Sequence, residues 1–228
     1  MTEREPAPNE EYEAQWGEQA RSEPRWPATV AVVAAIGLQV VLPHRLVLGP
    51  RWVLPSLEGA LGLALFVASP QRRTRESNRI RALSISLIAL INFANLVSLG
   101  YLVHALVVPH PVGGKTLIYS SVPVWLTNII VFSLWYWELD RGGPARRVQR
   151  VRKAPDFLFP QMNAPGSTRE DWSPTFLDYF YTSFTNVTAF SPTDTMPLTA
   201  WAKVLMMVQS LASLLTVGLV ISRAVNIL

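Results

Sequence analysis

The sequence predicts an all-α membrane protein, a polytopic bundle of apolar helices. Half of its 228 residues are hydrophobic, and only 16% are charged. The charges crowd into short segments, which leaves apolar runs of about 16 to 28 residues that can reach across a hydrocarbon core about 30 Å thick. Soluble domains do not need so much apolar length. We therefore expect four N-terminal transmembrane helices followed by a C-terminal helical hairpin, with five or six membrane segments in all.

Composition and spacing argue against several other classes of protein. The sequence pI is near 9.7, but the Arg clusters adjoin apolar runs instead of forming a stripe on a soluble module, which argues against nucleic-acid binding. The chain has no cysteine, so disulfides, thiolate metal sites and cysteine nucleophiles are excluded. His44, His104, His110 and Glu58 do not follow a metal-ligand spacing. No Ser/His/Asp arrangement is present, so we expect neither an enzyme nor a cofactor.

The N-terminal part of the chain divides into a polar tail and two apolar runs. Residues 1–24 are rich in acidic side chains and lack an apolar core, which is typical of a mobile tail. The transmembrane region, residues 25–138, opens with a crossing that begins at Trp26 and Pro27, an interfacial anchor and a first-turn residue. The second crossing starts near Pro55.

The third and fourth apolar runs occupy residues 82–108 and 116–138. The third is the longest in the chain. The fourth contains Pro123, which predicts a kink, because proline removes a helix hydrogen bond. It closes with an aromatic belt typical of a membrane interface, formed by Trp135, Tyr136 and Trp137.

The distribution of Lys and Arg predicts the orientation in a cell membrane. If the four runs all cross, the tail through Arg25, the loop at 71–81 and the polar connection at 139–172 share one side. These segments carry fifteen basic residues, whereas the two loops on the other side carry three, Arg45, Arg51 and Lys115. Because basic loops stay in the cytoplasm, we expect the N-terminus and both Arg-rich loops there, in contact with anionic lipid.

Polar side chains inside the apolar runs are expensive unless a partner satisfies them. They are Gln39, Glu58, Asn92, Asn95 and Asn128. The amides are expected to form hydrogen bonds between helices, worth about 0.6 kcal/mol on average. For Glu58, a structural pairing with Arg51 or Arg45 and a functional role are both open, and small-solute transport using Glu58 and the nearby histidines is one alternative function.

The C-terminal region, residues 173–228, predicts a helix, a polar turn and a long apolar helix. Ser173 and Pro174 are a good helix start. A second serine cap at Ser191, with an acid three residues later, is followed by an apolar helix from about 199 to 225. The first helix carries a polar stripe at helical spacing, made by Asp178, Thr182, Thr185 and Asn186.

A set of residues in this region follows a known order along the chain: Asp178, Ser183, Phe184, Thr188, Asp194, Pro197, Thr199 and Lys203. In this order the region resembles the pore helix, filter and inner helix of two-transmembrane potassium channels. The resemblance implies a pore loop in a homo-oligomer. The segment that corresponds to the filter, residues 189–193, reads AFSPT and has no glycine, whereas a potassium filter depends on glycine to aim successive carbonyls at the ion. A potassium-selective filter is therefore not expected.

The segments WYWELDRGGP, DFLFPQM and AFSPTDTMPLT are also similar to those of a family of bacterial integral membrane proteins of uncharacterised activity. This second resemblance covers most of the chain and implies a membrane location without an activity.

Two topologies are possible for the polar segment. Residues 175–191 can cross the membrane fully, which returns the C-terminus and Arg223 to the cytoplasm, or they can dip in from the cytoplasmic side and return. We favour the full crossing.

Two functions are predicted besides transport. The first is an oligomeric pore subunit, with a path lined by Thr182, Thr185, Asn186, Thr188, Ser191, Thr193 and Asp194. The second is a non-conducting membrane scaffold or partner-binding protein in which the pore loop is degenerate.

Overall fold

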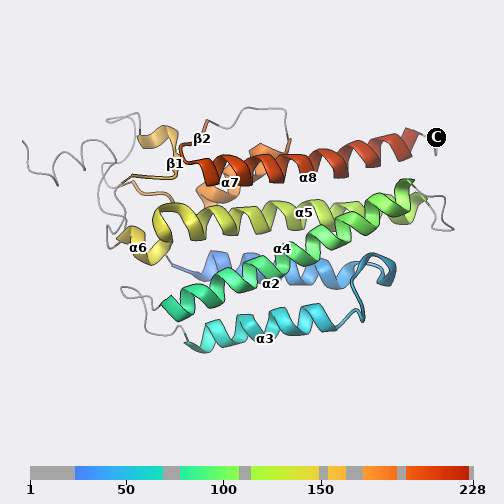
Figure 1. The fold of residues 1–228 in the computed structure, drawn as a ribbon, viewed down its shortest axis with the longest axis horizontal. Helices are drawn as coiled ribbons and strands as arrows, with labels where there is room; N and C mark the ends of the chain where they lie inside the picture. Colours follow the sequence, from blue (N-terminus) through green and yellow to red (C-terminus); the bar gives the residue numbers. More distant parts are fainter. Residues whose placement is uncertain are drawn as a thin grey trace, which may run out of the picture.

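The computed structural model describes residues 24–68, 78–107, 114–148, 154–162, 172–188 and 194–225. Within these ranges the chain forms a bundle of helices that run up and down along its long axis (Figure 1). The α-helices are α2 Trp26–Val41, α3 Val53–Ala68, α4 Asn78–Val107, α5 Gly114–Leu139, α6 Pro144–Val148, α7 Phe176–Thr188 and α8 Ala200–Val225. Three short 3-10 helices are η1 His44–Leu46, η2 Asp140–Gly142 and η3 Pro160–Met162.

The predicted all-α class is confirmed, with a small addition. Two strands of two residues each, β1 Phe157–Leu158 and β2 Met196–Pro197, pair antiparallel, with Phe157 opposite Pro197 and Leu158 opposite Met196. This pairing fixes the segment before α8 beside the segment after α6.

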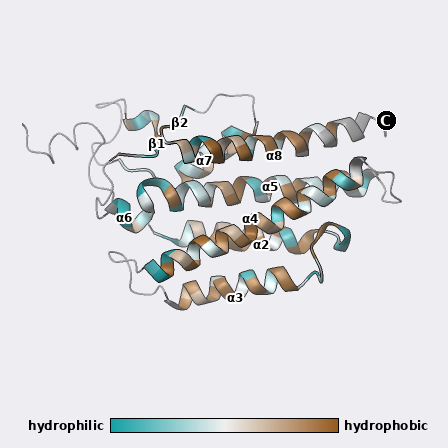
Figure 2. Cartoon of the chain, in the orientation of Figure 1, coloured by the Kyte–Doolittle hydropathy of each residue, from teal (hydrophilic) through white to brown (hydrophobic). Residues whose placement is uncertain are grey.

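In the part of the chain that the structure describes, three helices are long and apolar enough to cross a membrane, by length and composition: 78–105, 118–147 and 200–218. The helices α2 and α3 are apolar but shorter, at 16 residues each. Hydrophobic residues cover much of α2, α3, α4 and α8, while hydrophilic residues gather at α6 and at helix ends (Figure 2). Large apolar side chains point outward from the bundle, including Val33, Leu63, Phe66, Met207 and Leu214. An outer surface of this kind is suited to lipid.

The helix boundaries agree closely with the apolar runs. The first helix begins at Trp26, as predicted. The helix α3 begins at Val53, so Pro55 lies in its first turn, where a missing N–H is tolerated. The helix α4 begins at Asn78, which places Arg79 in a helix rather than in the expected loop.

The helix α5 lies at the centre of the bundle. It contacts α2, α4, α7 and α8, whereas α3 lies on the outside against α4 and α2. The buried face of α2 consists of Ala28, Ala31, Ala35 and Gln39. Small residues at this spacing allow two helices to approach closely. The helix α5 continues through Pro123.

The helices α7 and α8 run parallel, whereas the full crossing favoured from the sequence would make them antiparallel. Ser183 bonds to Gln209, and further along both helices Asn186 bonds to Ser210 and Val187 to Ser213. Residue numbers therefore rise together along the interface. Both helices begin at the end of the molecule where β1 and β2 lie, and the C-terminal end of α8 lies at the opposite end (Figure 1).

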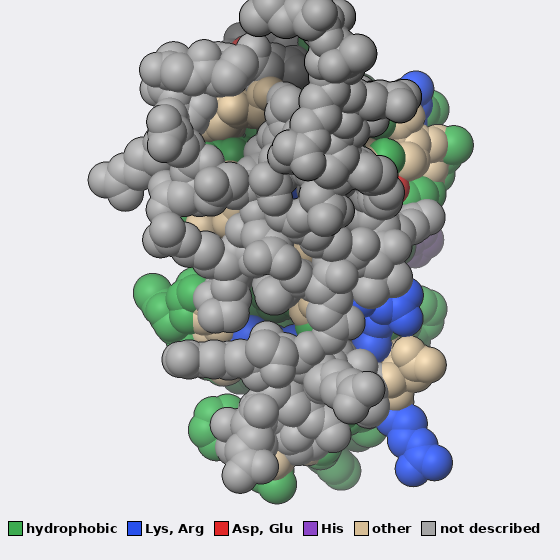
Figure 3. Space-filling model, turned by 90° about the vertical axis from the view of Figure 1, so that its left-hand side faces the viewer, with side chains coloured by type: hydrophobic (Ala, Val, Ile, Leu, Met, Phe, Trp, Pro, Cys, Tyr) green, Lys and Arg blue, Asp and Glu red, His purple; other side chains and the backbone are tan. Residues whose placement is uncertain are grey.

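The strand pairing explains this arrangement. Because β2 is held against β1, α8 must start at the end of the bundle where α5 finishes. A full crossing by residues 175–191 would instead have placed the start of α8 at the far end. Seen from the end that carries α6, the molecule presents Lys and Arg side chains among hydrophobic ones (Figure 3).

Candidate functional site

The surroundings of α7 contain nearly all the predicted C-terminal site residues that the structure describes. Its first turn is closed by Asp178, whose Oδ2 accepts hydrogen bonds from the backbone N–H of Thr175 at 2.7 Å and from the Thr175 hydroxyl at 2.8 Å. These bonds satisfy the Thr175 N–H at the start of the helix, and an acid in the first turn also complements the helix dipole. The capping residue is thus Thr175, two positions after the predicted Ser173. Asp178 has a structural role at this position.

The threonines of the stripe donate to their own helix. The hydroxyl of Thr182 donates to the carbonyl of Asp178 at 2.9 Å, Thr185 donates to Tyr181 at 2.9 Å, and Thr188 donates to Thr185 at 3.1 Å. Thr182 and Thr185 are buried. Because Ser and Thr hydroxyls can satisfy themselves on a preceding carbonyl, the stripe can pack inside the bundle without water.

Asn186 joins α7 to α8. Its Nδ2 donates to the Met206 carbonyl at 3.0 Å and to Gln209 Oε1 at 2.8 Å. Its Oδ1 accepts from the Ser210 hydroxyl at 3.1 Å. The predicted path residue is therefore an interhelical hydrogen-bonding group in this structure.

Gln209, which the sequence analysis missed, is the centre of this buried polar network. Its side chain is fully buried. Its Oε1 accepts from Tyr136 Oη at 2.5 Å as well as from Asn186, and its Nε2 donates to the Ser183 hydroxyl at 2.6 Å and to the Ser183 carbonyl at 3.1 Å. The Gln209 backbone carbonyl accepts from Asn128 at 3.3 Å. The sequence carries a signal for this role: Gln209 is an amide within the last apolar run, where a polar side chain is costly unless it finds a hydrogen-bond partner.

Hydroxyls from α8 also complete the C-terminal end of α7. The carbonyl of Asn186 accepts from Ser210 Oγ at 3.3 Å, and the carbonyl of Val187 accepts from Ser213 Oγ at 3.0 Å. The oxygen of Ser213 accepts in turn from Trp125 Nε1 at 3.0 Å. The last carbonyls of a helix have no partner within that helix, and leaving them bare in an apolar medium is costly. The helix α7 can therefore end inside the bundle.

The N-terminal ends of α7 and α8 are tied to α5 by two buried carboxylates, Asp140 and Asp156, which we call the carboxylate clasp. The Asp156 N–H donates to Asp140 Oδ1 at 2.8 Å, and the Arg141 N–H donates to Asp156 Oδ2 at 2.8 Å. Tyr179 of α7 donates to Asp140 Oδ2 at 2.6 Å. Trp201 of α8 donates through Nε1 to Asp156 Oδ1 at 3.0 Å. Each helix is thus held by one ring donor.

Two arginines balance the charge of the clasp. Arg141 Nε lies 3.7 Å from Asp140 Oδ2. Arg147, which is buried, donates to the carbonyls of Trp137 at 2.6 Å and Asp140 at 3.1 Å, and its guanidinium carbon lies 5.2 Å from the centroid of the Tyr179 ring. Burial raises the pKa of Tyr179 well above its ordinary value, so its hydroxyl stays protonated and can donate to the carboxylate.

A tight turn at the end of α5 makes the clasp possible. Arg141 has φ 52°, Gly142 has φ 86° and Gly143 has φ 103°. Glycine adopts such angles without strain. A Cβ on Gly143 would lie 2.9 Å from the Glu138 carbonyl oxygen. The two glycines in DRGGP therefore turn the chain back beneath α5 and bring Asp156 to Asp140.

The predicted polar residues of the N-terminal helices lie away from this site. Glu58 is fully buried. With the Gln39 amide oriented to satisfy its neighbours, its nitrogen lies 3.1 and 3.2 Å from the two Glu58 oxygens. The pairing of Glu58 with Arg51, one of the two alternatives left open by the sequence, is not seen, because Arg51 donates to the Val40 carbonyl. Asn92 is half-buried and Asn95 is buried, both on α4.

The remaining predicted residues are scattered or undescribed. Asp194 is exposed, and Ser191, Thr193 and His110 lie outside the described residues. His44 and His104 are exposed. Among the residues that the structure describes, no three His, Asp or Glu side chains are grouped so as to hold a metal ion. Nothing in this arrangement favours the predicted solute transport.

The site is therefore a short helix fixed at both ends, by the carboxylate clasp at its start and by the network around Gln209 towards its end. Comparison of this chain with protein-family models, with curated proteins and with solved structures gives no match.

Proposed function

We propose that this chain is an integral membrane protein in which α7 and the segment after it form a re-entrant pore loop, and that several copies assemble into a pore that is not selective for potassium. The parallel direction of α7 and α8 carries this proposal. The helix α7 has 13 residues, or about 20 Å at 1.5 Å per residue, which is less than the 30 Å of a hydrocarbon core.

A half-helix followed by a spanning helix in the same direction requires the chain to return to the surface where it entered. Thr182 Oγ1 lies 3.2 Å from Thr195 Oγ1, which places the residues just before α8 beside the first half of α7. Residues 189–193, which connect Thr188 to Asp194 and which we call the return segment, lie outside the described residues. A half-helix, a return segment and a spanning helix in this order are the parts of a pore loop, and this order supports the proposal.

The hydrogen bonds of the polar stripe on α7 indicate where a conduction path can lie. Thr182, Thr185 and Asn186 face the interior of one chain and have hydrogen-bond partners there. A path through that interior would have to break these bonds. The outward face of α7 is apolar and carries Leu177, Tyr181 and Phe184. We therefore assign the path to the space between copies, lined by the return segment and Asp194.

The chemistry of the return segment sets the expected selectivity. Residues 189–193 contain proline and no glycine, so the stacked carbonyl rings of a potassium filter are not expected. Asp194 is exposed at the end of this segment. A ring of carboxylates contributed by several copies would favour cations of more than one kind.

The proposal also assigns the side of entry. The half-helix enters from the end of the bundle that carries α6 and the Arg-rich segments. With basic segments in the cytoplasm, this end, together with the N-terminus, is cytoplasmic, and the protein resides in the cell membrane.

Ion flux through the purified full chain in liposomes tests this function. We expect flux of both sodium and potassium, and we expect Asp194→Asn to lower it about tenfold through loss of the carboxylate ring. Lys115→Gln, an exposed charge change at the opposite end, is the control and should leave flux unchanged. A folded oligomer that passes no ions, or flux that is indifferent to Asp194, would refute the proposal.

A second candidate function is a non-conducting scaffold that binds membrane partners or anionic lipid. The observation that favours it is that the polar side chains of α7, Thr182, Thr185 and Asn186, form their hydrogen bonds inside one chain. Of the arginines expected to contact lipid, Arg147 is buried, so this role would pass to Arg146, which is half-buried. This function predicts no flux under any gradient, together with weaker binding to anionic vesicles after Arg146→Gln.

A further inference from the structure

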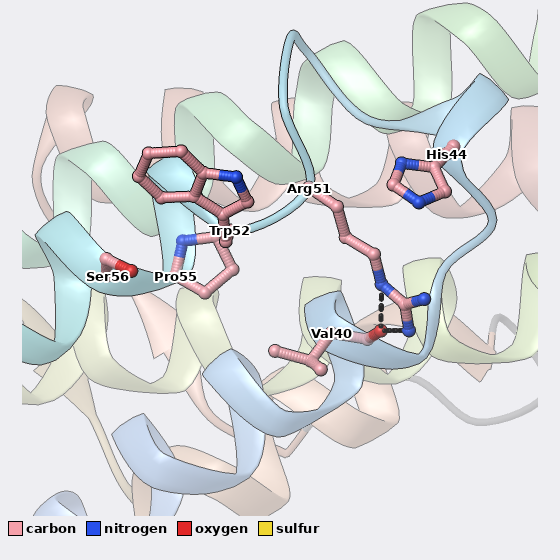
Figure 4. A pocket seen from close by; sticks show the side chains of 6 residues that line it. All are labelled: Val40, His44, Arg51, Trp52, Pro55 and Ser56. Carbon is pink, nitrogen blue, oxygen red and sulfur yellow. Dashed lines mark hydrogen bonds between the residues drawn. The ribbon is translucent and has the colours of Figure 1, made fainter.

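A cavity of about 490 Å³ opens between the end of α2 and the start of α3, at the end of the bundle opposite to the carboxylate clasp. It is lined by Val40, His44, Arg51, Trp52, Pro55 and Ser56 (Figure 4). The connection between the two helices shapes it, through the 3-10 turn η1 and through Gly49, which has φ 68°. This site is separate from α7 and does not depend on the proposed pore.

A fixed guanidinium forms part of the cavity wall. Arg51 donates through Nε to the Val40 carbonyl at 3.0 Å, and its Nη2 donates to the same oxygen. This carbonyl belongs to the last turn of α2, where the helix offers it no partner. Figure 4 shows the guanidinium held beside Val40, with the His44 ring on the same side of the cavity. The remaining Nη1 donors are left for another acceptor.

The charge around this cavity is positive and uncompensated. Glu58 is the only acidic residue between positions 25 and 68. Its carboxylate is buried and bonded to Gln39 instead of to Arg51. Among the described residues, no carboxylate lies within ion-pair distance of Arg51. Arg45, in the same connection, adds a further positive charge.

The other walls of the cavity suit an amphiphile. Trp52 is 71% exposed and Val40 is 42% exposed. An exposed indole beside the ends of two apolar helices is typical of the membrane–water interface. The cavity thus combines cationic donors with an apolar wall at the depth of lipid headgroups.

We propose that this cavity binds one anionic phospholipid. Its phosphate accepts hydrogen bonds from Arg51 and His44, and its upper acyl chain lies against Trp52 and Val40. A guanidinium matches the geometry of two phosphate oxygens, which strengthens the contact. A volume near 490 Å³ lies within the range of sites for small organic molecules, about 300 to 1,000 Å³.

Native mass spectrometry of the full chain, released from micelles with added lipid, tests this proposal. We expect retention of one phosphatidylglycerol in preference to phosphatidylcholine, and about tenfold weaker retention in Arg51→Gln, which loses the charged fork. Arg45→Gln removes the same charge from the same connection but from outside the cavity lining, and it should retain lipid as the parent does.

A further variant separates lipid binding from folding. Because Arg51 also caps α2, His44→Ala is measured beside it and should weaken retention several-fold with an unchanged elution volume. Three results would overturn the proposal: equal retention of the two lipids, an equal loss in the Arg45 and Arg51 variants, or displacement of the lipid by millimolar inorganic phosphate. The last result would identify a free-phosphate site instead.

Discussion

Replacing Gln209 with methionine tests the network that holds α7. The two side chains have similar volumes, so Gln209→Met keeps the packing and leaves little cavity. It removes the hydrogen bonds from Tyr136 and Asn186 to Oε1, and both bonds from Nε2 to Ser183. The perturbation is therefore confined to hydrogen bonding at the centre of α5, α7 and α8.

The magnitude follows from these four contacts. Hydrogen bonds between membrane helices average about 0.6 kcal/mol, which gives about 2.4 kcal/mol for the four. Tyr136 is fully buried and donates to Gln209 Oε1, and a buried donor left unpaired costs about 1 to 3 kcal/mol. Asn186 keeps the Met206 carbonyl. We therefore expect the free energy of unfolding to fall by about 2 to 4 kcal/mol.

Equilibrium unfolding of the purified protein in mixed micelles, followed by fluorescence of the eight tryptophans, measures this change. Met207→Leu alters an outward-facing side chain that is 68% exposed on the same helix, so it should change the free energy of unfolding by less than about 0.5 kcal/mol. A Gln209→Met variant as stable as the Met207 control would show that the network does not hold α7.

Two more predictions concern the start of α7 and the turn beneath α5. Tyr179→Phe removes the donor to Asp140 and should lower the free energy of unfolding by about 1 to 3 kcal/mol. The control Tyr181→Phe changes a ring that is 56% exposed and should leave the free energy of unfolding unchanged. Equal effects of the two variants would contradict the role of the carboxylate clasp. Gly143→Ala places a Cβ 2.9 Å from a carbonyl oxygen at φ 103° and should destabilise the protein by about 1 to 3 kcal/mol in thermal unfolding. The control Gly100→Ala places a Cβ in open space within α4 and should stabilise the protein by up to about 1 kcal/mol. A Gly143→Ala variant as stable as the parent would contradict the proposed role of the turn.

Local features of the chain were predictable from the sequence because their causes are local. Trp26 and Pro27 mark the start of a helix, and apolar length marks the helices themselves. Asp178 was placed correctly near a helix start, although the cap is Thr175. A polar stripe on α7 was also found. Periodicity shows that such residues share a face, but it does not show what that face contacts.

The sequence leaves the direction of α7 open between a full crossing and a re-entrant course, because the direction depends on contacts distant in sequence. Phe157 pairs with Pro197, and Asp140 bonds to Asp156 across the undescribed residues 149–153. Neither contact leaves a repeat or a spacing signal. Two-residue strands are too short to show alternation. The apolar pattern of α7 and of α8 would be the same whether the two helices ran parallel or antiparallel, so this pattern does not predict their relative direction.

Chemical labelling of single cysteines tests the re-entrant course of α7 most directly, since the chain has no cysteine of its own. Asp194→Cys, Ala154→Cys and His44→Cys each place a thiol at an exposed position. An impermeant thiol reagent is applied to intact cells and to inverted vesicles. We predict that positions 194 and 154 react from the same side of the membrane and position 44 from the other. Reaction of position 194 from the side of position 44 would show a full crossing and contradict the re-entrant half-helix.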